Sequence, residues 1–323
     1  DFPQVRRPWS EAEEPELLLA LQPLDNAATP DTATLMARLA TAAWHGSASE
    51  IDKHPFYRWT IIDEVAAASA PTALPCVPPT LAPLPPLAAS TTQDAAALIV
   101  SRRSSQRYDS RAMMPRATFL HLLDATLPRP QPPWPALGDD GHLALALFVH
   151  RVEGLAPGLY LLLRQAEDAA ELLPLLKPEY RFAARVDTAP HLQLYCLQTV
   201  EPVQLQRIAR SISCHQDIAS SSCFSLGMLA RFDAPLAVDP SRYRALYQQA
   251  GLLGQALYLE AEAAGYRGTG IGCYFDDPLH ELLGLTGTAR QSLYHFAVGI
   301  PIEDTRLETV PPYPPEIVAR PFT

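Results

Sequence analysis

The chain has 323 residues and a hydrophobic content of 48%, enough for a substantial core in one large domain or two small ones. Its 35 acidic and 25 basic residues give a formal charge of −10, which argues against nucleic acid or an anionic membrane surface as the main partner. No stretch reaches about 18 consecutive apolar residues, the length of a spanning helix, and no signal-type segment opens the chain, so we expect a cytoplasmic protein.

Residues 1–90 are expected to form an accessory segment. It contains two short helical candidates, over 32–43 and 61–70, without a sustained periodic pattern. The proline-rich run between Pro71 and Pro86 imposes an extended chain, which is typical of a linker or of a strap over another surface. We therefore expect the main domain to span residues 91–323.

The main domain is expected to interleave strands with helices. The predicted helices span 92–101, 116–126, 203–212, 217–230 and a stretch through Gly251 that ends at a Gly265 cap. Apolar runs predict buried strands over 143–149, 159–163, 192–197 and 293–299. This pattern favours a mixed α+β sandwich over a doubly wound sheet.

The cysteines show no spacing typical of a metal site. We expect reduced core residues of an intracellular protein at Cys76, Cys196, Cys214, Cys223 and Cys273. No histidine or cysteine pair has zinc-ligand spacing either, so the sequence predicts no metal.

The most informative segment is Ser101-Arg-Arg-Ser-Ser-Gln-Arg-Tyr108, directly after an apolar, alanine-rich run. Two guanidiniums beside hydroxyls form a compact phosphate site, because planar donors bind an oxyanion bidentately while hydroxyls add hydrogen bonds. The alternative interpretation is a charged surface turn at a helix end.

A second candidate segment follows the helix that ends at Gly265, and it reads Gly268-Thr-Gly-Ile-Gly-Cys273. We expect a flexible turn here. Its glycines either let backbone N–H groups approach a flat ligand or merely permit positive φ. They do not form the dinucleotide fingerprint, whose glycines lie between a strand and the start of a helix.

Together these segments resemble the nitroreductase superfamily of FMN-dependent oxidoreductases, and more closely its branch of SagB-type azoline (thiazole- and oxazole-forming) dehydrogenases. The resemblance covers roughly residues 95–310. Its elements, in order, are Arg102-Arg103-Ser104 with Tyr108-Asp109, then 152–160, then the Gly251/Gln255 helix with Gly270-Ile-Gly272, then 298–306. It implies a central mixed or antiparallel sheet wrapped by helices, and a homodimer whose subunits share each flavin.

The resemblance also implies which residues bind FMN, namely Arg102, Arg103, Ser104, Gln106, Gly270, Gly272, Cys273 and Arg306. The first three would bind the phosphate and ribityl chain, and Arg306 would complete the phosphate clamp. Backbone near Gly272 and Cys273 would donate to flavin N5. Gln106 stands where many relatives carry a basic residue.

Lys177 and Tyr180 match the neighbouring lysine and tyrosine that azoline dehydrogenases use for proton transfer. Removing hydrogen from a thiazoline needs a base for the ring proton alongside hydride transfer to flavin. The alternative is an exposed pair in a polar turn. The segment 134–141 departs from the family pattern. If it lies near a flavin, its two aspartates would disfavour the anionic reduced ring by like-charge repulsion.

The leading hypothesis is an FMN-dependent oxidoreductase that acts on a small molecule or a modified peptide by hydride transfer at flavin N5. Within enzymes, the alternative is an NAD(P)H-dependent reductase of nitro compounds or quinones. A third hypothesis comes from another class, a degenerate, non-catalytic dimeric scaffold of a biosynthetic complex.

Overall fold

The computed structural model describes residues 31–43, 59–70, 81, 83–131, 133–137 and 142–310. The chain divides into two compact units, Asp1–Ala66 and Ala67–Thr323. Helix α1 (Thr32–Thr41) belongs to the first, and the Asp31 carboxylate caps it by accepting a hydrogen bond from Thr34 N. Helix α2 (Thr60–Ala68) crosses the division between the units. Both predicted helices of this region are confirmed.

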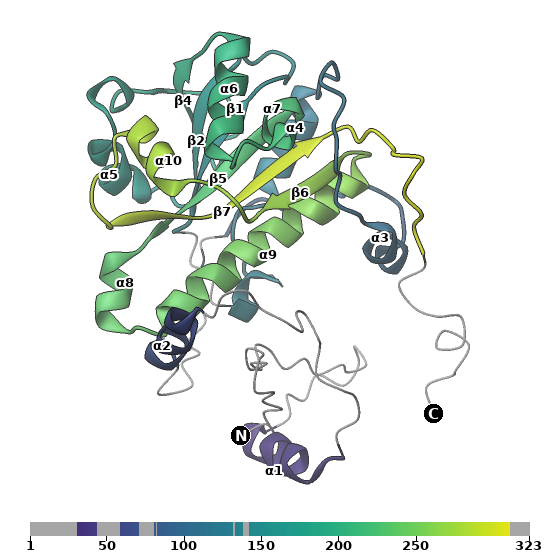
Figure 1. Ribbon diagram of the computed structural model, residues 1–323, viewed down its shortest axis with the longest axis vertical. Helices are drawn as coiled ribbons and strands as arrows, with labels where there is room; N and C mark the ends of the chain where they lie inside the picture. The colour runs from purple at the N-terminus through teal and green to yellow at the C-terminus, as the bar shows by residue number, and fades with distance from the viewer. Residues whose placement is uncertain are drawn as a thin grey trace. The chain divides into compact units, whose positions relative to one another are not determined.

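The second unit is built on a seven-stranded sheet with the order β3-β4-β2-β1-β5-β7-β6, in which every neighbouring pair is antiparallel (Figure 1). Its strands are β1 (Ala144–Val149), β2 (Gly158–Leu163), β3 (Ala184–Arg185), β4 (Gln193–Thr199), β5 (Phe224–Arg231), β6 (Arg267–Ile271) and β7 (Arg290–Gly299). Strands β1 and β2 are buried along their whole length, as expected of apolar runs that face core on both sides.

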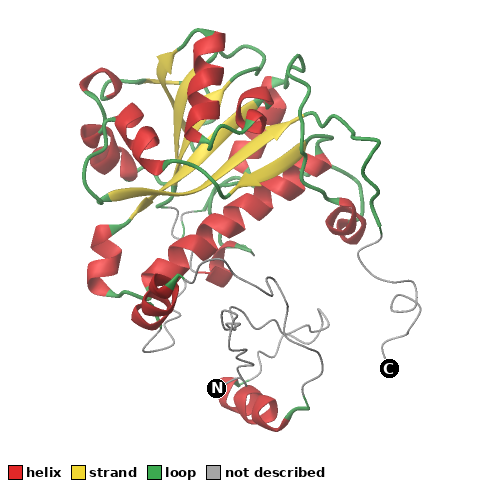
Figure 2. Cartoon of the chain, viewed as in Figure 1, coloured by secondary structure: helices red, strands yellow, loops and turns green. Residues whose placement is uncertain are grey.

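Helices cover both faces of this sheet (Figure 2). On one face, β1 side chains such as Leu145 and Leu147 pack with α4 (Arg116–Asp124) and α9 (Arg242–Ala263). On the other face, alternate residues such as Ala146 pack with α6 (Pro202–Ile212), α7 (Asp217–Ser221) and α10 (Asp276–Leu283). The expected α+β architecture, an antiparallel sheet wrapped by helices, is confirmed.

The remaining helices are short. They are α3 (Ala95–Ser101), α5 (Asp168–Leu172), α8 (Asp233–Val238) and the 3-10 turns η1 (Trp134–Leu137), η2 (Leu173–Leu175) and η3 (Pro178–Tyr180). Helix α3 begins after Asp94, whose carboxylate accepts a hydrogen bond from Ala97 N. Helix α9 ends as predicted, because Gly265 takes the left-handed conformation with φ +79°. Within the described residues, no helix is long and apolar enough to cross a membrane.

The helix predicted over 217–230 is wrong. Helix α7 ends at Ser221, and 224–231 is the inner strand β5. Both faces of β5 are buried, so its sequence is mostly apolar without alternation, and periodicity alone does not separate such a strand from a buried helix. Gly227 marks the close packing there, because a Cβ at this position would lie 2.7 Å from Leu279 Cδ2.

The prediction of a flexible glycine turn at 268–272 is also wrong for residues 268–271. Gly268 and Gly270 lie inside strand β6, which pairs with β7. A Cβ at Gly268 would stand 2.6 Å from the Phe296 ring, and one at Gly270 would overlap the Tyr294 hydroxyl. These glycines make room for aromatic side chains of the neighbouring strand.

Candidate functional site

Three residues expected to bind FMN converge on one side chain, Tyr258 of α9. The guanidinium carbon of Arg102, the residue that ends α3, lies 4.6 Å from the centroid of the Tyr258 ring. Ser104 Oγ lies 2.9 Å from the Tyr258 hydroxyl, and the backbone N–H of Gly270 donates to the same hydroxyl at 2.7 Å. The structure thus joins the arginine–serine motif to the glycine-rich strand.

Thr269 fixes this junction from the neighbouring position of β6. Its Oγ1 accepts a hydrogen bond from Ser105 N at 3.0 Å and donates to Ser105 O at 2.7 Å. The buried Tyr108 hydroxyl donates to the same Oγ1 at 2.9 Å, and burial raises the pKa of Tyr108 well above its usual value. The chain that follows Arg102 and Ser104 is therefore attached to the sheet at Ser105 and at Tyr108.

Arg102 and Arg103 differ in how they are held. Arg103 Nη1 donates to two carbonyl oxygens, those of Val100 and Arg102, each at 2.8 Å. Arg102 is half-buried and rests its cation on the Tyr258 ring face, a contact within the usual range of cation–π pairs. Among the described residues, neither guanidinium has a carboxylate in ion-pair range. A positive site beside the exposed Ser104 hydroxyl results.

Gln106 and Arg306 lie at the outer edge of this region. Gln106 is exposed. The segment that leads to Arg306 runs beside the arginine–serine segment, since Ile302 N donates to Arg107 O at 2.9 Å. Arg306 itself is 83% exposed and donates to both carboxylate oxygens of Asp304, at 2.9 and 2.6 Å. This pair raises the pKa of Arg306 and lowers the pKa of Asp304.

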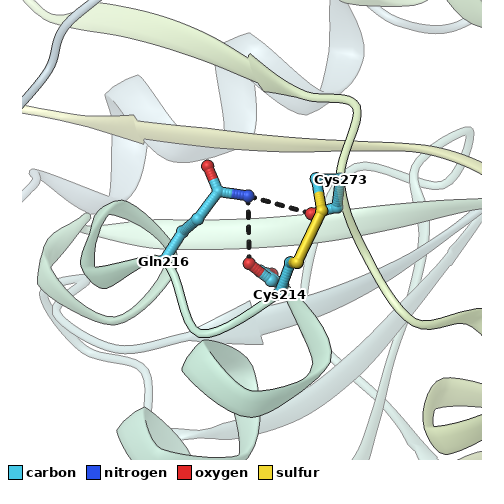
Figure 3. Close-up of a disulfide and its surroundings, with 4 residues drawn as sticks. Cys214, Gln216 and Cys273 are labelled. Atoms are coloured by element: carbon cyan, nitrogen blue, oxygen red, sulfur yellow. Dashed lines mark hydrogen bonds between the residues drawn. A yellow bond between two sulfur atoms is a disulfide. The ribbon is translucent and has the colours of Figure 1, made fainter. Parts of the chain in front are cut away.

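Gly272 and Cys273 follow β6 and lead into α10. A Cβ at Gly272 would meet nothing within 4 Å, so the backbone there is open to approach. Cys273 forms a disulfide with Cys214 of the α6–α7 turn, their Cα atoms being 5.7 Å apart (Figure 3). Gln216 reinforces the link, because its Nε2 donates to Cys273 O at 2.9 Å.

The expectation of reduced cysteines is therefore wrong for Cys214 and Cys273. The pair is separated by 59 positions, and the fold brings together two loops that no cysteine spacing in the sequence relates. Cys223 and Cys196 are free thiols, and burial raises the pKa of Cys223 to about 11. Cys76 lies outside the described residues.

The expected proton-transfer residues Lys177 and Tyr180 belong to the other face of the sheet from Tyr258. Tyr180 is buried in the core beside α6 and α10, and its hydroxyl donates to Gln198 Oε1 at 2.9 Å. Burial raises the pKa of Tyr180. Lys177 lines an open depression of about 380 Å³ with residues of α6 and α10, among them Ile212.

The segment 134–141 is only partly described. Trp134 is buried, and the Arg164 guanidinium carbon lies 5.3 Å from the centroid of its ring. The two aspartates expected to act near a flavin, at 139 and 140, lie outside the described residues.

Sequence reasoning missed Tyr258 and Thr269. Tyr258 follows Leu257 of the buried apolar stripe, so its ring sits at the edge of the stripe, where a hydroxyl can leave the core. That position was the available signal for a polar contact. Thr269 was hidden because the segment was expected to be a turn, in which its side chain has no defined direction.

No protein-family model matches the chain, and no curated protein matches it either. Similar solved structures include a candidate nitroreductase from Anabaena variabilis, 22% identical with a TM-score of 0.49, where the match covers 64% of this chain but only 38% of that one. A candidate nitroreductase from Ralstonia eutropha is 17% identical with a TM-score of 0.43, covering 72% and 100%.

A third similar structure is a candidate nitroreductase from Exiguobacterium sibiricum in complex with FMN. It is 15% identical with a TM-score of 0.38, and the match covers 71% of this chain and 98% of that one. Because the identities and TM-scores of these matches are low, any cofactor of this chain has to be argued from its own residues.

Proposed function

We propose that this protein is an FMN-dependent oxidoreductase of the azoline dehydrogenase type, which transfers hydride between flavin N5 and a small-molecule or modified-peptide substrate. One observation carries the proposal. Arg102 and Ser104 of one segment and Gly270 of another, distant in sequence, are all expected to bind FMN, and all three contact Tyr258. Such convergence is expected of a binding site and is not required by a charged surface turn.

The residues present fit the phosphate end of FMN. The guanidinium carbon of Arg102 lies over the Tyr258 ring, and its N–H groups would bind an oxyanion in the proposal. The exposed Ser104 hydroxyl adds a further polar group. The phosphate would therefore be held by Arg102 and Ser104.

The open backbone at Gly272 fits the other end of the cofactor, because a flat ring can approach where no side chain stands. When bound, FMN supplies the hydride chemistry at its N5. In the proposal, backbone N–H groups near Gly272 and Cys273 orient the ring from its N5 edge. The Cys214 disulfide and the Gln216 hydrogen bond hold that backbone in place.

Of the two proposed proton-transfer residues, Lys177 is the better placed. Its depression is also lined by Ile212, whose carbonyl accepts a hydrogen bond from Phe275 N at 2.7 Å, two residues beyond Cys273. The Tyr180 hydroxyl donates a hydrogen bond to Gln198 Oε1, and burial raises its pKa, so it stays protonated at neutral pH. We therefore assign the exchange of a substrate proton to Lys177 in preference to Tyr180.

The proposal includes a homodimer. Helix α3 exposes apolar side chains directly before Arg102, with Ile99 57% and Val100 43% exposed. A second subunit over this surface would remove these side chains from water next to the phosphate site.

A non-catalytic dimeric scaffold is the second candidate, and one feature favours it. Two of the expected phosphate ligands already bind acceptors of their own chain, Arg103 through carbonyls and Arg306 through Asp304. A scaffold would retain the dimer without binding flavin.

Anaerobic reduction of the FMN-reconstituted protein tests the proposed activity. Bleaching of the bound flavin by a thiazoline-containing peptide, with little bleaching by NADPH, is the expected result. Rapid bleaching by NADPH alone would favour a nitro or quinone reductase. A protein that retains no flavin would support the scaffold.

A further inference from the structure

We infer that Tyr258 is a positioning residue that makes the site selective for a phosphorylated flavin, by orienting both Arg102 and Ser104 toward the phosphate. This inference rests on the proposed function and deepens it. Tyr258 lies on the helix of Gly251 and Gln255, which carries part of the resemblance to azoline dehydrogenases, but it is not among the residues that the resemblance assigns to FMN.

The Tyr258 ring has one role, the support of Arg102. A guanidinium 4.6 Å from a ring centroid gains cation–π energy, and it gains more when the pair is partly desolvated, as here with both side chains half-buried. The ring is itself fixed, because it meets Phe296 edge-on with centroids 4.7 Å apart. The side chain of Arg102 thus has a rigid platform at the end of α3.

The Tyr258 hydroxyl has a second role, which follows from its hydrogen bonds. The Gly270 N–H can only donate, so the phenol oxygen accepts at 2.7 Å. Ser104 Oγ lies 2.9 Å from the same oxygen, and either hydroxyl can be the donor. In the inferred arrangement, the phenol donates to Ser104 Oγ. The hydroxyl proton of Ser104 is then available for an acceptor outside the chain, and a phosphate oxygen beside Arg102 is such an acceptor.

The same hydroxyl links the two ends of the site. Gly270 stands in β6 two positions before Gly272, so the strand that carries the open backbone also carries the donor to Tyr258. Removal of the hydroxyl would leave the Gly270 N–H without this acceptor, and the Ser104 hydroxyl would lose the partner that fixes its direction. The ring contact with Arg102 would remain.

The test compares FMN with riboflavin, which lacks only the phosphate. Dissociation constants for both are measured by flavin fluorescence for the wild type, Tyr258→Phe, Ser104→Ala and the double variant. We expect Tyr258→Phe and Ser104→Ala each to weaken FMN by about tenfold, the worth of one hydrogen bond to a charged group, with riboflavin changed by less than about twofold. The double variant should lose little more than either single variant, because the two groups act as a unit.

Two further variants control for structure. Tyr195→Phe removes a tyrosine hydroxyl from β4, where it donates to Gln193, and it should change neither affinity. Tyr258→Leu also removes the platform of Arg102, so it should weaken FMN beyond Tyr258→Phe. Circular dichroism confirms that each variant is folded.

An equal loss of FMN and riboflavin affinity in Tyr258→Phe, or additive losses in the double variant, would overturn the inference. If the wild type binds neither flavin, the proposed function fails, and the inference is decided with inorganic phosphate by ³¹P NMR. Phosphate line broadening that disappears in Tyr258→Phe would then support Tyr258 as the organiser of an anion site. Broadening that is absent from the wild type or unchanged in the variant would reject it.

Discussion

The hydroxyl of Tyr294 occupies the space in which a side chain at Gly270 would stand. Substitution Gly270→Ala therefore forces the Tyr294 ring or strand β6 to move. We expect a loss of about 1–3 kcal/mol in the free energy of unfolding, the usual cost of overpacking a core, measured by urea denaturation. The same shift should weaken FMN binding, because the Gly270 N–H would move relative to Tyr258.

Gly272→Ala is the matched control for this variant. Its Cβ would meet no atom within 4 Å, so the stability should change by no more than about 0.5 kcal/mol. If both alanine variants had the same stability, the packing of Tyr294 against Gly270 would be contradicted.

The disulfide between Cys214 and Cys273 should stabilise the protein by restricting the unfolded chain. It closes a loop of 59 positions, for which the loss of chain entropy corresponds to about 4 kcal/mol. We expect Cys214→Ser to lower the free energy of unfolding by that amount under non-reducing conditions. Under reducing conditions the variant and the wild type should become nearly equal.

Peptide mapping of the unreduced protein provides the control for this difference. It should recover the Cys214 and Cys273 peptides joined, while Cys223 reacts with alkylating reagents only after unfolding, because it is buried. Recovery of Cys273 as an alkylated single peptide would contradict the link.

The stability of the protein should fall as the solution becomes acidic, through its buried histidines. Burial lowers the pKa of His295 to about 3 and that of His150 to about 3. Between that value and the unfolded value near 6.5, the unfolded chain binds protons that the folded chain does not, so stability is full above about pH 6.5 and declines below it. Each histidine contributes about 1.4 kcal/mol per pH unit within this window.

Substitution His295→Asn should therefore reduce the slope of the unfolding free energy against pH between pH 6 and 4. The reduction should be about 1.4 kcal/mol per pH unit, which corresponds to one proton. An unchanged slope in His295→Asn would show that His295 is not held neutral in the core.

Asp304 competes with any phosphate for Arg306. If Arg306 completes the phosphate clamp, Asp304→Asn releases the guanidinium and should tighten FMN by a factor of about three, as expected for an exposed pair. Arg306→Gln should weaken FMN and make the change at position 304 ineffective. Titration of FMN into the single and double variants measures this, and equal affinities throughout would remove Arg306 from the site.

The sequence predicted those elements whose pattern is local. Strand β1 is marked by an unbroken hydrophobic stretch. The end of α9 is marked by Gly265, which takes the left-handed conformation typical of a helix cap. Strand β5 was missed because a strand buried on both faces carries no alternation. Strand β6 was missed because its glycines serve the aromatic side chains of β7, a relationship between strands that only the fold reveals.

The residues of the candidate site also divide into those with a local signal in the sequence and those without one. The residues Arg102 and Ser104 were found because arginine and serine together indicate a phosphate site in sequence alone. Tyr258, which joins them to Gly270, and Cys214, which ties down Cys273, lie in distant segments without a motif of their own. Contacts of this kind depend on tertiary packing, so the sequence predicted candidate ligands but not the residues that contact them.

The visible absorption spectrum of the purified protein, recorded after incubation with FMN and gel filtration, tests the central claim most directly. We expect flavin bands at roughly 370 and 450 nm that co-elute with the protein, together with their loss in an Arg102→Ala variant that remains folded. A protein that elutes without these bands at saturating FMN, or an Arg102→Ala variant that retains them in full, would contradict the proposed flavin site.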